Sequence, residues 1–156
     1  MKKGFTLLEV SIAMFIGSII VLIGISLFSH SIKSYKEAVS KDREEVYSKE
    51  ALRFIEGEIN DVKNKFIRVE GNQLILRKLT GDKYTIKASK VSESKSKIVI
   101  IYDKVIGRDT TDIILEGIAD FKVKSDKNLI YINIYTRNGE EYERCFGTNK
   151  LEKGTF

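Results

Sequence analysis

The feature that most constrains this chain is an unbroken apolar run near its N-terminus, from Phe5 to Phe28. Of its 24 residues 17 are apolar, only Glu9 can carry a charge, and no proline interrupts it. As an α-helix rising about 1.5 Å per residue, the run would reach about 36 Å, which exceeds the roughly 30 Å hydrocarbon core of a bilayer. The run is therefore expected to be a membrane-spanning helix.

Glu9 makes this more than an ordinary span. A carboxylate costs about 2.5–3.5 kcal/mol at the middle of a membrane and less near the interface. Such a residue usually has a polar partner and a function. The simpler alternative is that Glu9, only one turn inside the run, reaches the lipid headgroups.

The residues around Glu9 carry a resemblance. Gly4-Phe5-Thr6-Leu7-Leu8-Glu9-Val10, behind the leader Lys2-Lys3, resembles the class III signal of type IV pilins and pseudopilins. The resemblance implies that prepilin peptidase cleaves between Gly4 and Phe5, that Phe5 is then N-methylated, and that Glu9 guides filament assembly. The partners it implies are this peptidase and methyltransferase, other pilins through their N-terminal helices, an inner-membrane assembly platform, and membrane lipid before assembly.

The chemistry implied for Glu9 is physically reasonable. Cleavage would leave a charged amino group on Phe5, and methylation keeps that charge. A cation at the start of one helix and a carboxylate one turn along another attract strongly in low dielectric. Since a missing partner leaves an uncompensated charge, Glu9 is expected to fix the stagger between adjacent helices.

The apolar run also indicates how the helix packs and which other kinds of N-terminal segment it could be. Ala13, Gly17 and Gly24 lie near one helical face and favour close helix packing in lipid, although membrane helices tolerate glycine in any case. The run is longer than the roughly 7–15 apolar residues of a secretory signal peptide. A plain signal-anchored surface protein remains the alternative to a pilin.

Composition argues against catalysis. His30 is the only histidine and Cys145 the only cysteine, so a Ser/His/Asp site lacks a partner in the C-terminal region and no intramolecular disulfide can form. Glycine-rich phosphate loops and Cys/His metal spacings are absent from the sequence, so we expect no enzyme, no cofactor and no metal site. Cys145 is expected to be a small buried residue in a strand.

A helical pattern continues past the apolar run to about Lys65. Apolar residues recur at helical spacing between charged ones, at Ile32, Tyr35, Val39, Val46, Ala51, Ile55, Ile59, Val62 and Phe66. A helix from Phe5 to about Lys65 would be some 90 Å long, far more than a compact domain of about 100 residues can cover. Its first half is therefore expected to be bare of its own domain.

Beyond Phe66 the pattern is that of strands and tight turns. Strands are expected at 66–69, 73–79, 83–88, 98–102, 112–116, 121–124, 129–136 and 140–146, with a polar loop at Ser89–Lys97, a kink or bulge at Gly117 and a hairpin turn at Asn138-Gly139. Short turns imply an antiparallel sheet whose apolar face the stripe from Val39 to Phe66 would cover. The expected class is α+β with a pilin-like fold: a long N-terminal helix, membrane-spanning then amphipathic, packed on this sheet.

The expected organisation is a leader at 1–4, a transmembrane and assembly half-helix at 5–28, and a pilin-like domain at 29–156. The chain would be a single-pass cytoplasmic membrane protein whose C-terminal domain lies outside the cytoplasm, and a surface filament after assembly. The stretch Gly117 to Val123, Gly-Ile-x-x-Phe-x-Val, also resembles minor pseudopilins of the J/W type.

The favoured function is therefore a minor pilin or pseudopilin of a type IV pilus, a competence filament or a type II secretion-like filament. A DNA-binding tip subunit is the alternative. Its best support is a lysine cluster around Tyr84, interrupted by Glu93, and the simpler interpretation is a solvated loop; the lysines are Lys83, Lys87, Lys90, Lys95 and Lys97.

Overall fold

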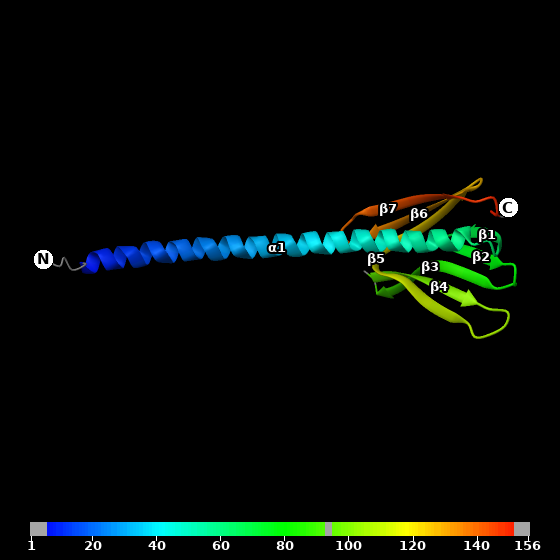
Figure 1. Ribbon diagram of the computed structural model, residues 1–156, viewed down its shortest axis with the longest axis horizontal. Helices are drawn as coiled ribbons and strands as arrows, with labels where there is room; N and C mark the ends of the chain where they lie inside the picture. The colour runs from blue at the N-terminus through cyan, green and yellow to red at the C-terminus, as the bar shows by residue number, and fades with distance from the viewer. Residues whose placement is uncertain (1–5, 93–94, 152–156) are drawn as a thin grey trace. The chain divides into compact units, whose positions relative to one another are not determined.

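A computed structural model describes residues 6–92 and 95–151 of the chain. The predicted cleavage and methylation positions Gly4 and Phe5 lie outside the described residues. Two compact units make up the chain, residues 1–42 and 43–156. The helix α1, Leu7–Asn60, begins in the first unit and ends in the second (Figure 1).

The first unit consists of helix wherever it is described beyond Thr6. Its large apolar side chains from Leu7 to Phe28 are all exposed, and no residue of its most apolar window is buried. By length and composition α1 is the one described helix that could span a membrane. An apolar helical surface of this extent needs lipid or other apolar helices around it.

The end of α1 is set by side chains that the sequence pattern did not reveal. The amide of Asn64 donates to the carbonyls of Glu58 (2.6 Å) and Ile59 (3.0 Å), and the ammonium of Lys150 donates to those of Asp61 and Val62. The bonds from Asn64 satisfy carbonyls that the last helical turn leaves unpaired, and those from Lys150 satisfy two carbonyls just after the helix. The predicted end near Lys65 is thus wrong, because capping stops the helix at Asn60.

Seven strands follow the helix and form one sheet in chain order, each antiparallel to its neighbours. Their bounds are β1 (Asn64–Glu70), β2 (Gln73–Lys78), β3 (Lys83–Ser92), β4 (Lys95–Asp103), β5 (Thr110–Asp126), β6 (Leu129–Thr136) and β7 (Glu141–Gly147). The predicted pilin-like α+β fold and the central place of Ile98–Tyr102 are confirmed, since β4 is the middle strand.

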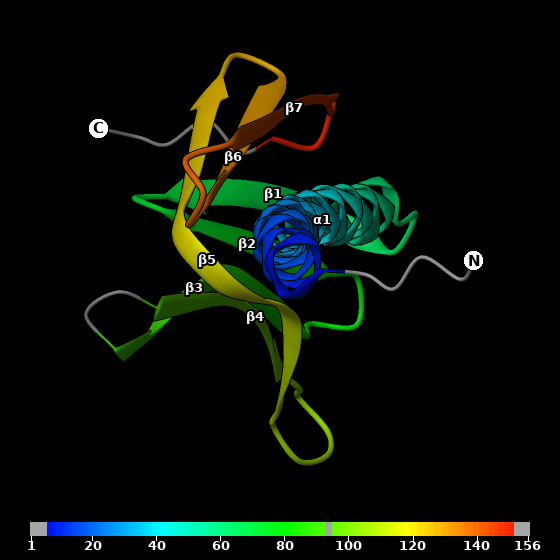
Figure 2. The same cartoon turned by 90° about the vertical axis from the view of Figure 1, so that its left-hand side faces the viewer.

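The core lies between the last turns of α1 and one face of the sheet. Figure 2 shows the sheet curving around the helix, with β3 and β4 on one side of it and β6 and β7 on the other. The helix buries Ser48, Ala51, Leu52, Ile55 and Ile59, one face at spacings of three and four. Val62 and Phe66 are not part of this stripe: Val62 is exposed after the helix, and Phe66 lies in β1.

Two strand predictions are wrong in an informative way. The expected polar loop Ser89–Lys97 is mostly strand, because β3 and β4 pair out to Ser92 and Lys95. The expected strands at 112–116 and 121–124 are one strand, β5, which pairs with β4 through its first half and with β6 through its second. Gly117, at φ +76°, has no partner in the β4–β5 register, which passes from Glu116 to Ile118, and the pairing with β6 begins at Ile118. Gly117 therefore forms a bulge at the point where β5 passes from one neighbour to the other.

The predicted hairpin turn at Asn138-Gly139 is present, although in a longer form. The N–H of Gly139 donates to the carbonyl of Thr136, and the N–H of Thr136 donates to that of Glu140. Only Gly139 has positive φ here, at +82°, so the loop is Arg137-Asn138-Gly139, a type I turn with a left-handed third residue. Cys145 follows in β7 and is exposed, which contradicts the expected buried position.

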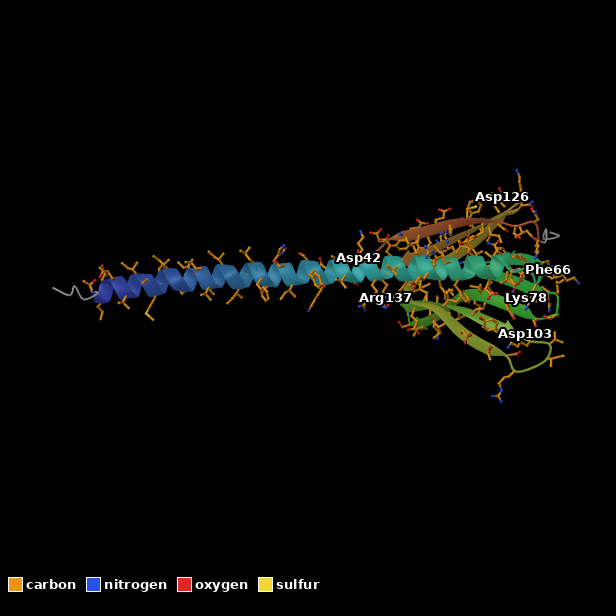
Figure 3. The ribbon with its side chains drawn as sticks, in the orientation of Figure 1. Asp42, Phe66, Lys78, Asp103, Asp126 and Arg137 are labelled. Atoms are coloured by element: carbon orange, nitrogen blue, oxygen red, sulfur yellow. The ribbon has the colours of Figure 1, made fainter. Side chains whose placement is uncertain are left out.

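A buried lysine joins the sheet to the end of the helix. Lys78, whose side chain is 4% exposed, donates to Asp61 (2.7 Å) and Glu58 (3.1 Å) and lies over the ring of Tyr84. Figure 3 shows Lys78 near Phe66, at the end of the sheet opposite Arg137. Burial alone would lower the pKa of Lys78, but its hydrogen bonds to Asp61 and Glu58 outweigh burial and raise that pKa.

The segment after β7 returns to the first strand. Leu151 forms a parallel bridge with Ile67, and the N–H of Ile67 donates to the carbonyl of Lys150 (2.9 Å). Since β1 is the outermost strand, this segment covers part of an edge that would otherwise present unpaired backbone groups.

Candidate functional site

The N-terminus of α1 is capped by a reciprocal pair of hydrogen bonds between Thr6 and Glu9. The Thr6 N–H donates to Glu9 Oε2 (2.9 Å), and the N–H of Glu9 donates to Thr6 Oγ1 (3.3 Å). The Thr6 hydroxyl also lies 3.1 Å from Glu9 Oε2. With Thr6 as N-cap and Glu9 three residues on, this is a capping box, which satisfies donors that a helix start leaves free.

The capping box fixes where the Glu9 carboxylate lies. It is drawn back toward the helix N-terminus, where helix dipole and free N–H groups favour a negative charge. Thr6 supplies hydrogen bonds but no positive charge, so the carboxylate keeps its net charge. The role of Thr6 was missed from the sequence, although the Thr-x-x-Glu spacing is a sufficient signal for it.

Two of the serine hydroxyls in the apolar half are satisfied within the helix. Ser11 donates its hydroxyl to the carbonyl of Leu7 (3.0 Å), and Ser18 donates to that of Phe15 (2.7 Å). Within residues 7–28, Glu9 is the one ionisable side chain. At Gly17 and Gly24 an added Cβ would meet nothing within 4 Å, so both positions are open for close approach by another helix.

The five predicted lysines are not all brought together. Lys83 and Lys87 of β3 and Lys97 of β4 share the sheet face opposite the core, because they alternate with the inward-facing Ile86 and Ile98. Arg77 of β2, directly opposite Lys83, adds a fourth cation to this outer face. Lys90 has the inward parity of Ala88, and the side chain of Lys95 lies outside the described residues.

On this outer face a carboxylate lies in register opposite two of the three lysines, but not opposite Lys87. Lys87 pairs in register with Gln73 and Val99, so no acidic residue lies directly opposite it. Asp103 lies opposite Lys83, and Glu116 opposite Lys97. In the part of the chain that the structure describes, none of these three lysines forms an ion pair with a carboxylate.

An apolar helix with a capped carboxylate in its first turn, continuing into a segment that covers an antiparallel sheet, defines the type IV pilin-like class of protein. The prokaryotic N-terminal methylation motif matches residues 1–25 and supports the same class. It implies processing by prepilin peptidase and membrane anchoring through the apolar helix.

The chain belongs to the family described as "Putative Competence protein ComGF", which matches residues 31–142. Pilin families are structural and generally without enzymatic activity. Comparison with curated proteins and with solved structures gave no match.

Proposed function

We propose that the chain is a minor pilin-like subunit of a competence filament, assembled through its N-terminal helix. Residues 1–4 are the leader, 5–28 the transmembrane and assembly half of the helix, and 29–156 the domain outside the cytoplasm. The observation that carries the proposal is the exposed apolar half of α1 with one carboxylate, capped by Thr6, in its first turn.

In the proposed assembly, Glu9 pairs with the methylated amino group of Phe5 in a neighbouring subunit. The capping box supports this role, because it holds the carboxylate at the helix start without neutralising it. Lipid covers the apolar surface before assembly, and neighbouring helices cover it afterwards. Ala13, Gly17 and Gly24 form the face along which those helices approach most closely. An inner-membrane platform completes the set of partners.

The first test is the N-terminus of the protein in its native organism. We expect the intact mass of the N-terminal peptide to correspond to N-methylated Phe5. Gly4→Ala should leave full-length precursor with Lys2-Lys3 attached, and Ala13→Gly, which lies outside the cleavage motif, should be processed normally. A native peptide that begins at Met1 would instead indicate a plain signal-anchored surface protein.

A second candidate function is contact with a nucleic acid backbone. It is favoured by one observation: Lys83, Lys87 and Lys97 share the outer face of the sheet with Arg77 and form no ion pair among the described residues. Cations arranged along neighbouring strands suit repeated phosphates, and the competence family makes DNA the polyanion of interest.

Salt dependence tests this second function. We expect the full chain in neutral-lipid nanodiscs to bind a labelled DNA oligonucleotide with an affinity that falls steeply with salt. Replacing Lys83, Lys87 and Lys97 by Gln should reduce the slope of log affinity against log salt by about 2–3. A matched control replaces Lys122, Lys124 and Lys127 of the β5–β6 hairpin by Gln. Equal losses in both triple variants would leave only nonspecific charge attraction.

A further inference from the structure

A groove runs between α1 and the β4–β5 pair, within the second unit. Its volume is about 580 Å³, and buried Ala51 and Ile100 contribute to its lining. Three large apolar side chains at the groove are half-exposed: Tyr47 (51%), Phe54 (43%) and Ile113 (49%). An apolar surface of this kind, open on one side, resembles the apolar centre of a protein interface.

The rim of the groove is acidic. Glu50 of α1 and Asp112 of β5 line it, and neither forms an ion pair in the described part of the chain. Tyr102 also lines the groove, and its burial raises the pKa of its phenol. The nearby carboxylates of Glu58 and of the rim residue Asp112 raise that pKa further. The chemistry that complements the groove is an apolar tip flanked by cations.

The chain itself carries such a tip in the loop between β4 and β5. Val105 is 66% exposed and Ile106 90% exposed, and they lie between Lys104 and Arg108 in the sequence. The loop begins after Asp103, which Figure 3 shows at the same end of the sheet as Lys78.

Hydrogen bonds hold this loop in shape. The N–H of Val105 donates to Asp82 Oδ1 (2.9 Å), and the N–H of Lys104 donates to Asp109 Oδ1 (3.2 Å). Gly107, at φ +125°, allows the reversal that follows Ile106. Because the loop is already anchored, presenting Ile106 to a partner costs little ordering entropy.

We propose that the groove of one copy receives the Lys104–Asp109 loop of a second copy. Val105 and Ile106 would cover Tyr47, Phe54 and Ile113, while Lys104 and Arg108 approach Glu50 and Asp112. The contact joins two different surfaces, so it is heterologous. The copy that contributes its loop keeps its groove free, and the copy that contributes its groove keeps its loop free. The inference rests on the proposed function in that it places the chain in an assembly.

Disulfide trapping tests this contact in cells that express two differently tagged full-length copies. Both carry Cys145→Ser; one carries Ile106→Cys and the other Phe54→Cys. We expect a mixed-tag disulfide dimer on mild oxidation. The matched control replaces Ile106→Cys by Lys127→Cys, an exposed position in the β5–β6 turn, and should give little dimer.

Charge exchange provides a second arm. Lys104→Glu with Arg108→Glu in the loop copy should lower dimer yield by about tenfold. Glu50→Lys with Asp112→Lys in the groove copy should restore it. Dimer no greater than in the Lys127→Cys control, or dimer that is indifferent to charge reversal, would overturn the contact.

The same cells separate this inference from the proposed function. Sheared filaments are blotted for the chain beside the disulfide assay. Chain in the filaments without the disulfide overturns the loop-in-groove contact and leaves the subunit role standing. The disulfide in membranes, with the chain absent from filaments, supports the contact and contradicts the filament role.

Discussion

Thr6 and Glu9 form the capping box of α1, and in the proposed assembly Glu9 also pairs with a neighbouring subunit. The capping box requires a side-chain acceptor at position 9, which Glu or Gln can supply. Pairing with a neighbour's amino group requires a negative charge, which only the carboxylate supplies. The two roles of Glu9 can therefore be separated by substitution.

We expect Glu9→Gln to be cleaved normally, to keep the capping hydrogen bonds and to enter filaments as poorly as Glu9→Ala. Thr6→Val, which weakens the cap but keeps the charge, should reduce incorporation less. The measurement is the ratio of chain in sheared filaments to chain in membranes, by quantitative blotting. Normal incorporation of Glu9→Gln would mean that the cap, not the charge, is what assembly needs.

Lys78 matters at the same scale for stability. Lys78→Met should cost about 1–3 kcal/mol, less than the about 3–5 kcal/mol of a fully buried pair, because Glu58 and Asp61 partly reach water. Lys49→Met, on the exposed helix surface, is the control and should change stability by less than about 0.5 kcal/mol. Denaturant unfolding of both variants provides the comparison.

The cluster of Lys78, Glu58 and Asp61 should make the stability of the domain depend on pH. Hydrogen bonds from Lys78 and from the N–H of Lys63 hold the pKa of Asp61 below its usual value. The folded state then binds protons less readily than the unfolded one. The stabilisation is therefore present above about pH 3.9 and is lost as pH falls through the folded-state pKa. Melting between pH 2 and 7 should show this loss in the parent chain and a smaller one in Lys78→Met.

At the scale of elements, the sequence predicted most strands but misjudged where two of them end. The stretch 89–97 is mostly polar, yet β3 continues to Ser92 and β4 begins at Lys95, because strands that project past the core need no apolar face. The kink or bulge expected at Gly117 is present as a bulge, but the segments on either side of it form one continuous strand, β5, and not two. Alternation of residues does not distinguish these cases, since both interrupt it.

Replacement of glycine by alanine should have opposite effects on stability at Gly117 and at Gly57. Gly117→Ala should destabilise the domain by about 1–2 kcal/mol, because φ is +76° there while an added Cβ finds only ordinary contact at 3.7 Å. Gly57→Ala, in the helix with no atom within 4 Å, should stabilise it by up to about 1 kcal/mol. Unfolding free energies of both variants test the assignment; a neutral Gly117→Ala would refute the bulge as a strained position.

For the whole molecule, the apolar N-terminal run and the turn spacing were enough to predict a helix over an antiparallel sheet. Ala51, Ile55 and Ile59 were correctly assigned to the covering stripe. The groove and the Lys78 cluster were not predictable, because each joins residues from the helix and from strands far along the chain. The same is true of the lysines: only the register shows that Lys87 and Lys97 share a face while Lys90 does not.

A fragment that begins at Ser31 should fold without the apolar half of α1, since the second unit contains the whole buried core. We expect a soluble, folded fragment with mixed helix and strand signals in circular dichroism and a single cooperative unfolding transition. Addition of Phe54→Asp, at the half-exposed groove, should leave the fold intact, whereas Ile55→Asp, in the core, should abolish it. A disordered fragment would mean that the sheet depends on more than its own helix segment.

The sheet order has a consequence for the timing of folding. Each strand pairs with the next one in the chain, so strands can join the sheet one after another as they leave the membrane, with little delay from distant partners. The closing contacts are different, because Lys150 and Leu151 reach back to the helix end and to Ile67 only after all seven strands have emerged. A chain interrupted before Lys150 would keep the Asn64 cap of α1, but it would lack the contacts that close the segment after the helix and the outer edge of β1.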